Sequence, residues 1–375
     1  MNILRRLPIS RLLLLCGVVV VVGIGATALA LAVGAGPTPP PKPLADAMHD
    51  ALSAPKADGV SARIQFTNHL IEGASLASGG GEASQLASSP LLSGASGRLW
   101  IGSNGRARLE LQSEKGDTQI FYDGQSLSMY DASTNTLYRY TPPPKQTASG
   151  GPSGSGSDSG GADTAAGKIP TVKEIEEGIA HAGKQANVSG ATPTDVAGQA
   201  AYTVRVSPRE NGGLIGGAEL SWDAVHGAPL RAAVYSTTSA APVVELAATE
   251  VSYGPVDNST LNFTPPADAK IEEVTLPSKP SSGDSAANDP SKPSVSTHGK
   301  GLAGIAVVEN PVKAGQKESE GSQLEGLQKV SINGTSASEL PTALGTLLTF
   351  ERAGVRYLLA GSVTPASIEA FARSL

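Results

Sequence analysis

Residues 97–140 constrain this chain most, because apolar and polar side chains alternate there at period two with almost no helical periodicity. The alternating segments are GRLWIGS, RARLELQ, DTQIFYDG and SLSMYD, and turn-forming SNG, EKGD, DG and DASTN stand between or after them. This pattern predicts an antiparallel meander in a mainly β (α+β) chain. The stretch offers apolar surface but few reactive groups, which favours binding over catalysis.

Composition and charge limit the classes of function. With 375 residues of which 39% are hydrophobic, the chain is able to bury a core, yet 44 Gly and 27 Pro indicate linkers between two folded units. The 28 basic and 34 acidic residues give a net charge of -6 with no dense basic stripe, so nucleic acid is not an expected partner. A single cysteine excludes an internal disulfide.

Residues 1–36 predict a signal anchor with one membrane span. The uncharged run of residues 12–33 is long enough, at ~1.5 Å per residue, to cross a ~30 Å hydrocarbon core. Three preceding arginines predict a cytoplasmic start and an extracytoplasmic remainder. A cleaved, exported form is the alternative, because residues 28–30 resemble a small-residue cleavage site.

The rest of the chain divides by composition. Residues 37–43 are a Pro-rich spacer expected to hold the folded part away from the bilayer. Residues 44–275 form the first folded unit, with a low-complexity, disordered insert at 142–167. A Pro- and Ser-rich linker, 276–299, precedes a small α+β domain at 300–375.

Periodicity also predicts individual elements. Helical spacing occurs in LADAMHDALSAP, TVKEIEEGIAHAG and PASIEAFARSL. Strand signals in the first unit are GVSARIQFTNHL, AAYTVRVSP, GAELSWDA, LRAAVYST and VVELAATEVSYG, and those in the tail are GLAGIAVVEN, LGTLLTFERA and VRYLLAGS.

The order of these motifs resembles a known superfamily. A helix and a strand, then GRLWIGS, QIFYDGQSLSMYD and LNFTPPADA, are similar to the LolA-like lipoprotein carriers, where a tryptophan strand, a DG..L..Y hairpin and an F.FTPP ending recur. The tail, from GLAGIAVVEN to VRYLLAGSVTPASIEAFARSL, resembles the small carboxy-terminal domain of RseB and MucB, which follows a LolA-like domain.

The resemblance implies an open, curved antiparallel half-barrel, covered by helices, whose apolar cavity accepts acyl chains. The alternating strands agree, because a sheet with one apolar face needs a cover. One departure lies at Ser103 and Asn104, where carriers of this superfamily often have an arginine that helps to latch the lid. This departure puts the carrier-specific latch in question, whereas lipid binding does not depend on it.

Reactive groups are sparse. The five histidines have no metal-ligand spacing: His49, His69, His181, His226 and His298. GGLIGGAEL precedes a strand rather than a helix, so it predicts a hairpin turn and not a phosphate loop. Carboxylates in turns and strand ends, Asp123, Asp131 and Asp223, are explained by bonds to their own backbone. We therefore expect no enzyme activity, metal or cofactor.

Large amphipathic or deformable side chains, together with strand leucines, are the expected lipid-binding residues, and dry core packing is their alternative role. They are Trp100, Leu109, Leu111, Tyr122, Met129, Tyr138, Tyr202, Trp222 and Tyr235.

These inferences lead to a membrane-tethered, extracytoplasmic protein that sequesters the acyl chains of lipid or lipoprotein. One alternative is an RseB-like envelope-stress regulator, in which the carboxy-terminal domain binds an anti-sigma factor or another envelope protein. Another is a structural envelope module without a ligand.

Overall fold

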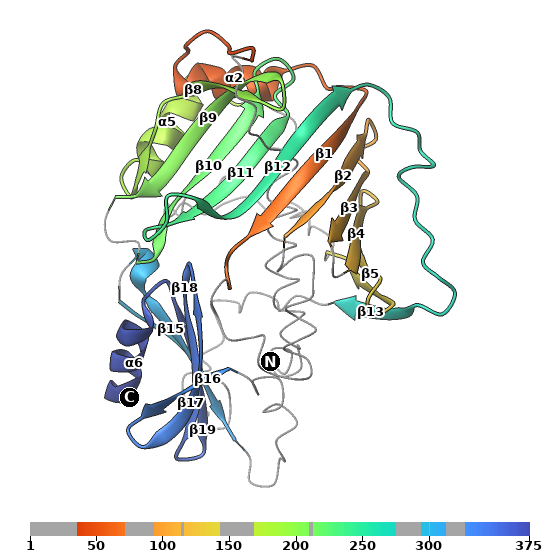
Figure 1. Cartoon of the computed structure of the whole chain (residues 1–375). Helices are drawn as coiled ribbons and strands as arrows, with labels where there is room; N and C mark the ends of the chain where they lie inside the picture. The colour runs from red at the N-terminus through yellow and green to blue at the C-terminus, as the bar shows by residue number, and fades with distance from the viewer. Residues whose placement is uncertain are drawn as a thin grey trace, which may run out of the picture.

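The computed structural model describes residues 36–71, 94–113, 116–142, 169–209, 213–274, 294–299, 301–312 and 327–375. These residues form a large sheet, a small sheet and three α-helices (Figure 1). Strands dominate and the helices lie against the sheets, so the predicted mainly β (α+β) class is confirmed.

The large sheet has 13 strands in the described part of the chain, in the order β13-β6-β5-β4-β3-β2-β1-β12-β11-β10-β9-β7, with β8 also paired to β9. All pairs are antiparallel except β13 with β6, which is parallel. The strands are β1 (Gly59–Asn68), β2 (Ala95–Gly102), β3 (Ala107–Ser113), β4 (Gly116–Tyr122), β5 (Leu127–Asp131), β6 (Thr136–Tyr140), β7 (Ala186–Val188), β8 (Thr192–Val196), β9 (Gln199–Pro208), β10 (Ile215–Asp223), β11 (Pro229–Ser236), β12 (Pro242–Tyr253) and β13 (Lys270–Val274).

The predicted meander is confirmed as β2 to β6, each strand paired with the next along the chain. Its turns form for local reasons. Asp123 Oδ1 accepts the amides of Gln125 and Ser126 at 2.8 and 2.7 Å, and Gly124 takes the left-handed φ of 101° that the turn requires. The carboxylate thus closes a hairpin, as the sequence indicated.

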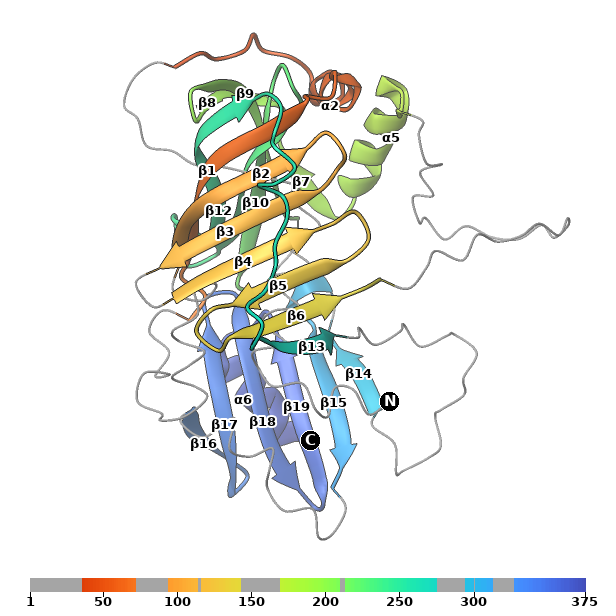
Figure 2. The same cartoon turned by 90° about the vertical axis from the view of Figure 1, so that its right-hand side faces the viewer.

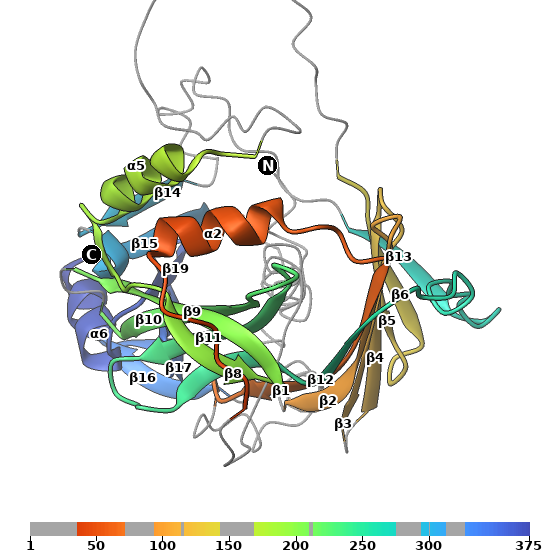
Figure 3. The same ribbon diagram turned by 90° about the horizontal axis from the view of Figure 1, so that it is seen from above.

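The sheet curls without closing, so the half-barrel form is also confirmed (Figure 3). Two helices lie on its open side: α2 (Leu44–Ser53) and α5 (Val172–Ala182). A capping box starts α5, because the side chain of Thr171 accepts the Glu174 amide while the Glu174 carboxylate accepts the Thr171 amide. Both helices agree with the periodicity of the sequence.

A strap, residues 254–269, joins β12 to β13 across the outside of the meander (Figure 2). Phe263 stacks on Phe121 with ring centroids 4.2 Å apart and lies 5.4 Å from Tyr130. Arg108 Nη1 donates to the carbonyl of Thr260 at 3.0 Å. The strap therefore covers this side with aromatic packing and delivers β13 to the edge strand β6.

The small sheet has six strands among the described residues, in the order β14-β15-β19-β18-β17-β16. They are β14 (Ser294–His298), β15 (Ile305–Pro311), β16 (Gln328–Ile332), β17 (Thr335–Thr342), β18 (Gly345–Arg352) and β19 (Val355–Gly361), with a 3-10 turn at Gly301–Ala303. Helix α6 (Pro365–Ser374) covers one face, where Ile368 and Ala372 join the fully buried Leu348 and Leu359.

Two sets of hydrogen bonds from backbone amides connect the sheets. The amide of Leu214, just before β10, donates to the carbonyl of Ser362 at 2.8 Å, and the Ile215 amide donates to the Ser362 hydroxyl at 3.2 Å. The amide of Ala343 donates to the carbonyl of Leu70 at 2.9 Å. The small sheet is thereby joined to the end of β1 and to the β9–β10 hairpin.

The structure describes parts of two connecting segments. The Pro-rich residues 37–43 contact the large sheet, because the Tyr202 hydroxyl donates to the Pro40 carbonyl at 2.7 Å and Lys42 forms a β-bridge with Ala191. The expected linker 276–299 ends in strand β14, whose β-branched and polar residues pair with β15 through the backbone although every side chain is exposed.

Other expectations lie outside the described residues. These are the membrane span, apart from Gly36, and the insert 142–167, apart from Pro142. Within the described ranges, no helix has the length and apolar character needed to cross a membrane.

Candidate functional site: the concave face of the large sheet

The helices identify the inner face of the curved sheet. Leu44 and Ala47 of α2 pack with Tyr202 of β9 and Trp222 of β10 in one buried cluster, and the rings of Tyr202 and Trp222 lie 6.2 Å apart. Tyr202 and Trp222 are directly opposite each other in the strand pairing, so both point to the same side. We call this side the concave face and the other side the convex face.

Strand register extends the concave face across the sheet, because residues directly opposite each other share a side. Leu220 pairs with Ala232, Ala232 with Leu246, and Leu246 with Phe66. The same argument continues through β2 to β6. The face carries Tyr202, Val204, Val206, Leu220, Trp222, Ala232, Leu246, Ala248, Ile64, Phe66, Leu99, Leu109, Leu111, Ile120, Leu127, Met129 and Tyr138.

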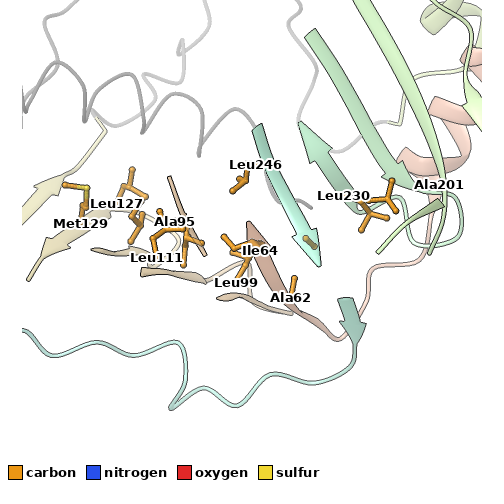
Figure 4. Close-up of a cluster of buried hydrophobic side chains, with 14 residues drawn as sticks. Ala62, Ile64, Ala95, Leu99, Leu111, Leu127, Met129, Ala201, Leu230 and Leu246 are labelled. Atoms are coloured by element: carbon orange, nitrogen blue, oxygen red, sulfur yellow. The ribbon is translucent and has the colours of Figure 1, made fainter. Parts of the chain in front are cut away.

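Most of these side chains form one apolar cluster along the sheet (Figure 4). Its described members come from strands and from the β8–β9 turn, and none comes from a helix. Helices α2 and α5 pack instead with the β9–β10 end of the face. Further along the same two strands, Val206 of β9 and Leu220 of β10 are each 38% exposed, although they share the concave side. The face is therefore wider than its described helical cover.

The convex face of β9 to β12 has the opposite chemistry. Arg231 donates to Glu219 Oε2 at 2.7 Å, to Glu245 Oε1 at 2.5 Å and to the Tyr235 hydroxyl at 2.8 Å. Tyr235 in turn donates to Glu219 Oε2 at 2.7 Å, and Arg205 donates to Glu219 Oε1 at 2.8 Å. The charges are thus paired within the sheet, and their bonding capacity is used in holding the strands together.

This network shifts several pKa values. Burial would raise the pKa of Glu219, but hydrogen bonds from Arg231, Tyr235 and Arg205 outweigh it and lower the pKa overall. Burial raises the pKa of Tyr235, and its hydrogen bond to Glu219 adds to the rise. Burial opposes the charge of Arg231, yet its bonds to Glu219 and Tyr235 raise its pKa. Glu219 and Arg231 therefore stay charged at neutral pH.

Seven of the nine expected lipid-binding residues lie on the concave face. They are Leu109, Leu111, Tyr122, Met129, Tyr138, Tyr202 and Trp222. Tyr122 is 41% exposed, whereas Leu109, Leu111, Met129, Tyr202 and Trp222 are buried. The structure thus gathers on one surface residues from strands β3 to β6 and from β9 and β10.

Trp100 and Tyr235 lie on the convex face and are not brought together with the others. Trp100 is directly opposite Arg108, whose guanidinium carbon lies 5.8 Å from the indole centroid. Tyr235 belongs to the Arg231 network. Trp100 meets the charged neighbour with the face of its ring, whereas Tyr235 uses its hydroxyl, and both contacts lie on the polar side of the sheet.

Several concave-face residues are not among the nine expected ones. Ile64 and Phe66 of β1 and Leu246 of β12 share the side of Leu109 and Leu111, and so do Leu99 of β2 and Ile120 of β4, which the alternation of the sequence already places on one face of their strands. The available signal was the odd or even position of each residue along its strand, because alternate residues face the same side. This signal assigns residues to the concave face only when the pairing of neighbouring strands is known, and the local sequence does not supply that pairing.

The remaining candidate chemistry has structural explanations. Asp223 Oδ1 accepts the amides of Val225 and His226, each at 2.7 Å, while Oδ2 accepts the Tyr253 hydroxyl at 2.7 Å. This carboxylate shapes the β10–β11 turn. Across the described part of the chain, no group of three or more His, Cys, Asp or Glu residues is arranged to hold a metal ion.

Of the glycine-rich GGLIGGAEL segment, Gly213 and Leu214 lie in the β9–β10 connection and the residues from Ile215 onward lie in β10, which agrees with the expected hairpin. Gly213 has a φ of 68°, and a Cβ on it would lie 1.6 Å from the Ser362 carbonyl oxygen. The glycine is needed for close approach of the small sheet and not for a phosphate.

The chain was compared with protein families, with curated proteins and with solved structures, and only solved structures are similar to it. No protein-family model and no curated protein matches the sequence. MucB of Pseudomonas aeruginosa, solved in complex with MucA, is similar over 88% of this chain and 96% of that chain, with 14% identity and a TM-score of 0.43.

Two further structures are similar. An uncharacterized conserved protein from Thermus thermophilus matches over 62% of this chain and 97% of that chain, with 12% identity and a TM-score of 0.32. A LolA superfamily protein from Nitrosomonas europaea matches over 85% and 90%, with 8% identity and a TM-score of 0.20. MucB and the LolA superfamily are also the proteins that the sequence motifs resemble. The likeness concerns the fold alone.

Proposed function

We propose that this chain is a membrane-tethered, extracytoplasmic protein that binds the acyl chains of lipid or lipoprotein on the concave face of its large sheet. The observation that carries the proposal is the continuity of this apolar face across β1 to β6 and β9 to β12, with Val206 and Leu220 exposed beyond the helices. An acyl chain needs extended apolar surface and few polar partners, which is the chemistry of this face.

The proposed mechanism is burial of methylene groups against the sheet. Each buried methylene contributes about 0.8 kcal/mol, so a chain of ten or more offsets the translational and rotational freedom lost on binding. No cofactor and no bond-making step is involved. The face contains aromatic, aliphatic and thioether side chains, including Met129, that adapt to chains of differing shape.

The test is uptake of a fluorescent fatty acid by the full chain and by two charge variants. Leu220→Glu adds a carboxylate to the concave face. Because position 220 is already 38% exposed, water reaches the new charge and the sheet does not have to bury it. Gln65→Glu adds the same charge at an exposed site on the convex side of β1.

We expect Leu220→Glu to weaken uptake about tenfold, because one charge against an acyl chain costs at least the ~1.4 kcal/mol that a tenfold change represents. Gln65→Glu should bind as the parent does. Equal uptake by all three proteins, with unchanged circular dichroism, would remove the concave face as the binding surface.

A second function, binding of an envelope protein, is favoured by edge strand β14. All five of its residues are exposed, with Val295 62% exposed, and among the described strands it pairs with β15 alone. An exposed edge with apolar and β-branched side chains suits addition of a partner strand. This proposal predicts that Val295→Pro abolishes cross-linking of a membrane partner while fatty-acid uptake stays unchanged. Joint loss of both would contradict that division of labour.

A further inference from the structure

The first described residues are tied firmly to one end of the large sheet. Gly36 lies so close to Asp195 that a Cβ on the glycine would be 1.9 Å from the carboxylate oxygen. Pro39 is buried, the Tyr202 hydroxyl holds Pro40, and Lys42 both bridges to Ala191 and forms an ion pair with Asp50. The segment is an integral part of this end of the domain.

Only a short stretch of chain separates that segment from the uncharged run of residues 12–33. Three residue steps separate the last residue of the uncharged run 12–33 from Gly36. At no more than ~3.6 Å per residue, they reach about 11 Å. With the run spanning a bilayer, the end of the sheet that holds Gly36 lies within about one headgroup layer of the hydrocarbon core.

The same end of the sheet presents two exposed aliphatic side chains. Leu52, near the end of α2, is 53% exposed, and Val225, in the β10–β11 turn, is 67% exposed. The two lie on adjoining elements, because a Cβ on Gly227 of that turn would be 2.1 Å from the carbonyl oxygen of Ala51. α2 stands at the end opposite the small sheet (Figure 1).

The turn that carries Val225 is held rigidly. Asp223 accepts the Val225 and His226 amides, the Tyr253 hydroxyl fixes the other Asp223 oxygen, and the rings of His226 and Tyr253 stack with centroids 3.7 Å apart. Val225 is therefore presented to solvent by a fixed turn.

We infer that this end of the sheet rests on the lipid bilayer in which the amino-terminal run is anchored, with Leu52 and Val225 entering the headgroup region. Short tethering keeps the two side chains at high effective concentration beside the surface, so a small apolar contact suffices. The exposed Lys56 and Asp58 next to them carry opposite charges, so the contact needs no anionic lipid. This inference concerns orientation on the membrane and does not depend on acyl-chain binding by the concave face.

The test measures depth of the site in the membrane. The full chain, with Cys16→Ala, is reconstituted in phosphatidylcholine vesicles and labelled with an environment-sensitive dye at Val225→Cys. The matched control is Val295→Cys, a valine of similar exposure, 62%, on the small sheet. Both sites are exposed, so neither label needs to disturb a core.

We expect lipids that carry a shallow spin label to quench the dye at position 225 severalfold more than the dye at 295, together with a blue-shifted emission at 225. Equal quenching at the two positions would overturn the inference. A mass showing that the exported protein has lost residues 1–30 would overturn it as well, because the tether would be gone. Neither result touches fatty-acid uptake, so failure of this inference is distinguishable from failure of the proposed acyl-chain binding.

Discussion

Tyr235→Phe separates the roles of the two faces of the large sheet, because it removes one oxygen atom from the convex face. The Tyr235 hydroxyl accepts from Arg231 at 2.8 Å and donates to Glu219 at 2.7 Å, and the side chain is 8% exposed. A hydrogen bond to a charged group contributes about 1.5–3 kcal/mol. The substitution removes both of these bonds, but Arg231 and Glu219 keep their direct 2.7 Å contact, so neither charge is left unpaired and we expect a destabilisation of about 1.5–3 kcal/mol.

Urea unfolding followed by tryptophan fluorescence measures this change, because Trp100 and Trp222 both lie in the large sheet. With a slope of roughly 3 kcal/mol per molar urea, the midpoint should fall by about 0.5–1 M. Fatty-acid uptake measured under native conditions should stay at the parent level. An unchanged midpoint combined with weakened uptake would refute the assignment of Tyr235 to the convex network and return it to the ligand surface.

Three further variants test other parts of the structure. Phe263→Ala should destabilise the large sheet by about 2–3 kcal/mol, less than for a fully buried phenylalanine, because the half-buried ring loses its stacking on Phe121 and its tilted contact with Tyr130. A thermal midpoint equal to that of the parent would argue against the strap as a stabilising element. Gly213→Ala should loosen the contact with the small sheet, because the added carbon would lie 1.6 Å from the Ser362 carbonyl oxygen and the backbone φ of this residue is 68°. Hydrogen exchange at the Leu214 and Ile215 amides should then accelerate, and unchanged protection of these amides would contradict the prediction. Glu339→Gln should remove a pH dependence of stability. Burial, with the nearby Glu369 carboxylate, raises the pKa of Glu339, so the wild type is most stable below the ordinary pKa of 4.5 and loses stability as pH rises through the folded-state pKa. The variant should keep its thermal midpoint across that pH range.

Period-two alternation was enough to predict the meander and much of its apolar surface. Leu109 and Leu111 share a side because they are two residues apart, and the register then places Ile120 and Met129 beside them. The turn carboxylate Asp123 was equally readable, because its bonds to the amides of Gln125 and Ser126 are local. Features set by neighbours in sequence were therefore predictable.

Features set by distant contacts were not. Strand β17 (Thr335–Thr342) buries Ser338 and Glu339, so it lacks the apolar alternation of a half-buried strand. Strand β13 exists because the strap brings Lys270 beside Thr136, a parallel pairing with no local signal. Trp100 was assigned to the ligand by its size, whereas its side of the sheet is fixed by pairing with Arg108.

The most direct test of acyl-chain binding is photo-cross-linking of the full chain with a diazirine fatty acid, followed by mapping of the labelled residues in β3, β4 and β5. The account predicts label at alternate positions, on Leu109, Leu111, Ile120 and Met129, and none on Arg108, Glu110 or Gln119 between them. Label spread evenly over residues of both faces, or confined to Trp100 and Tyr235 on the convex face, would contradict binding on the concave face.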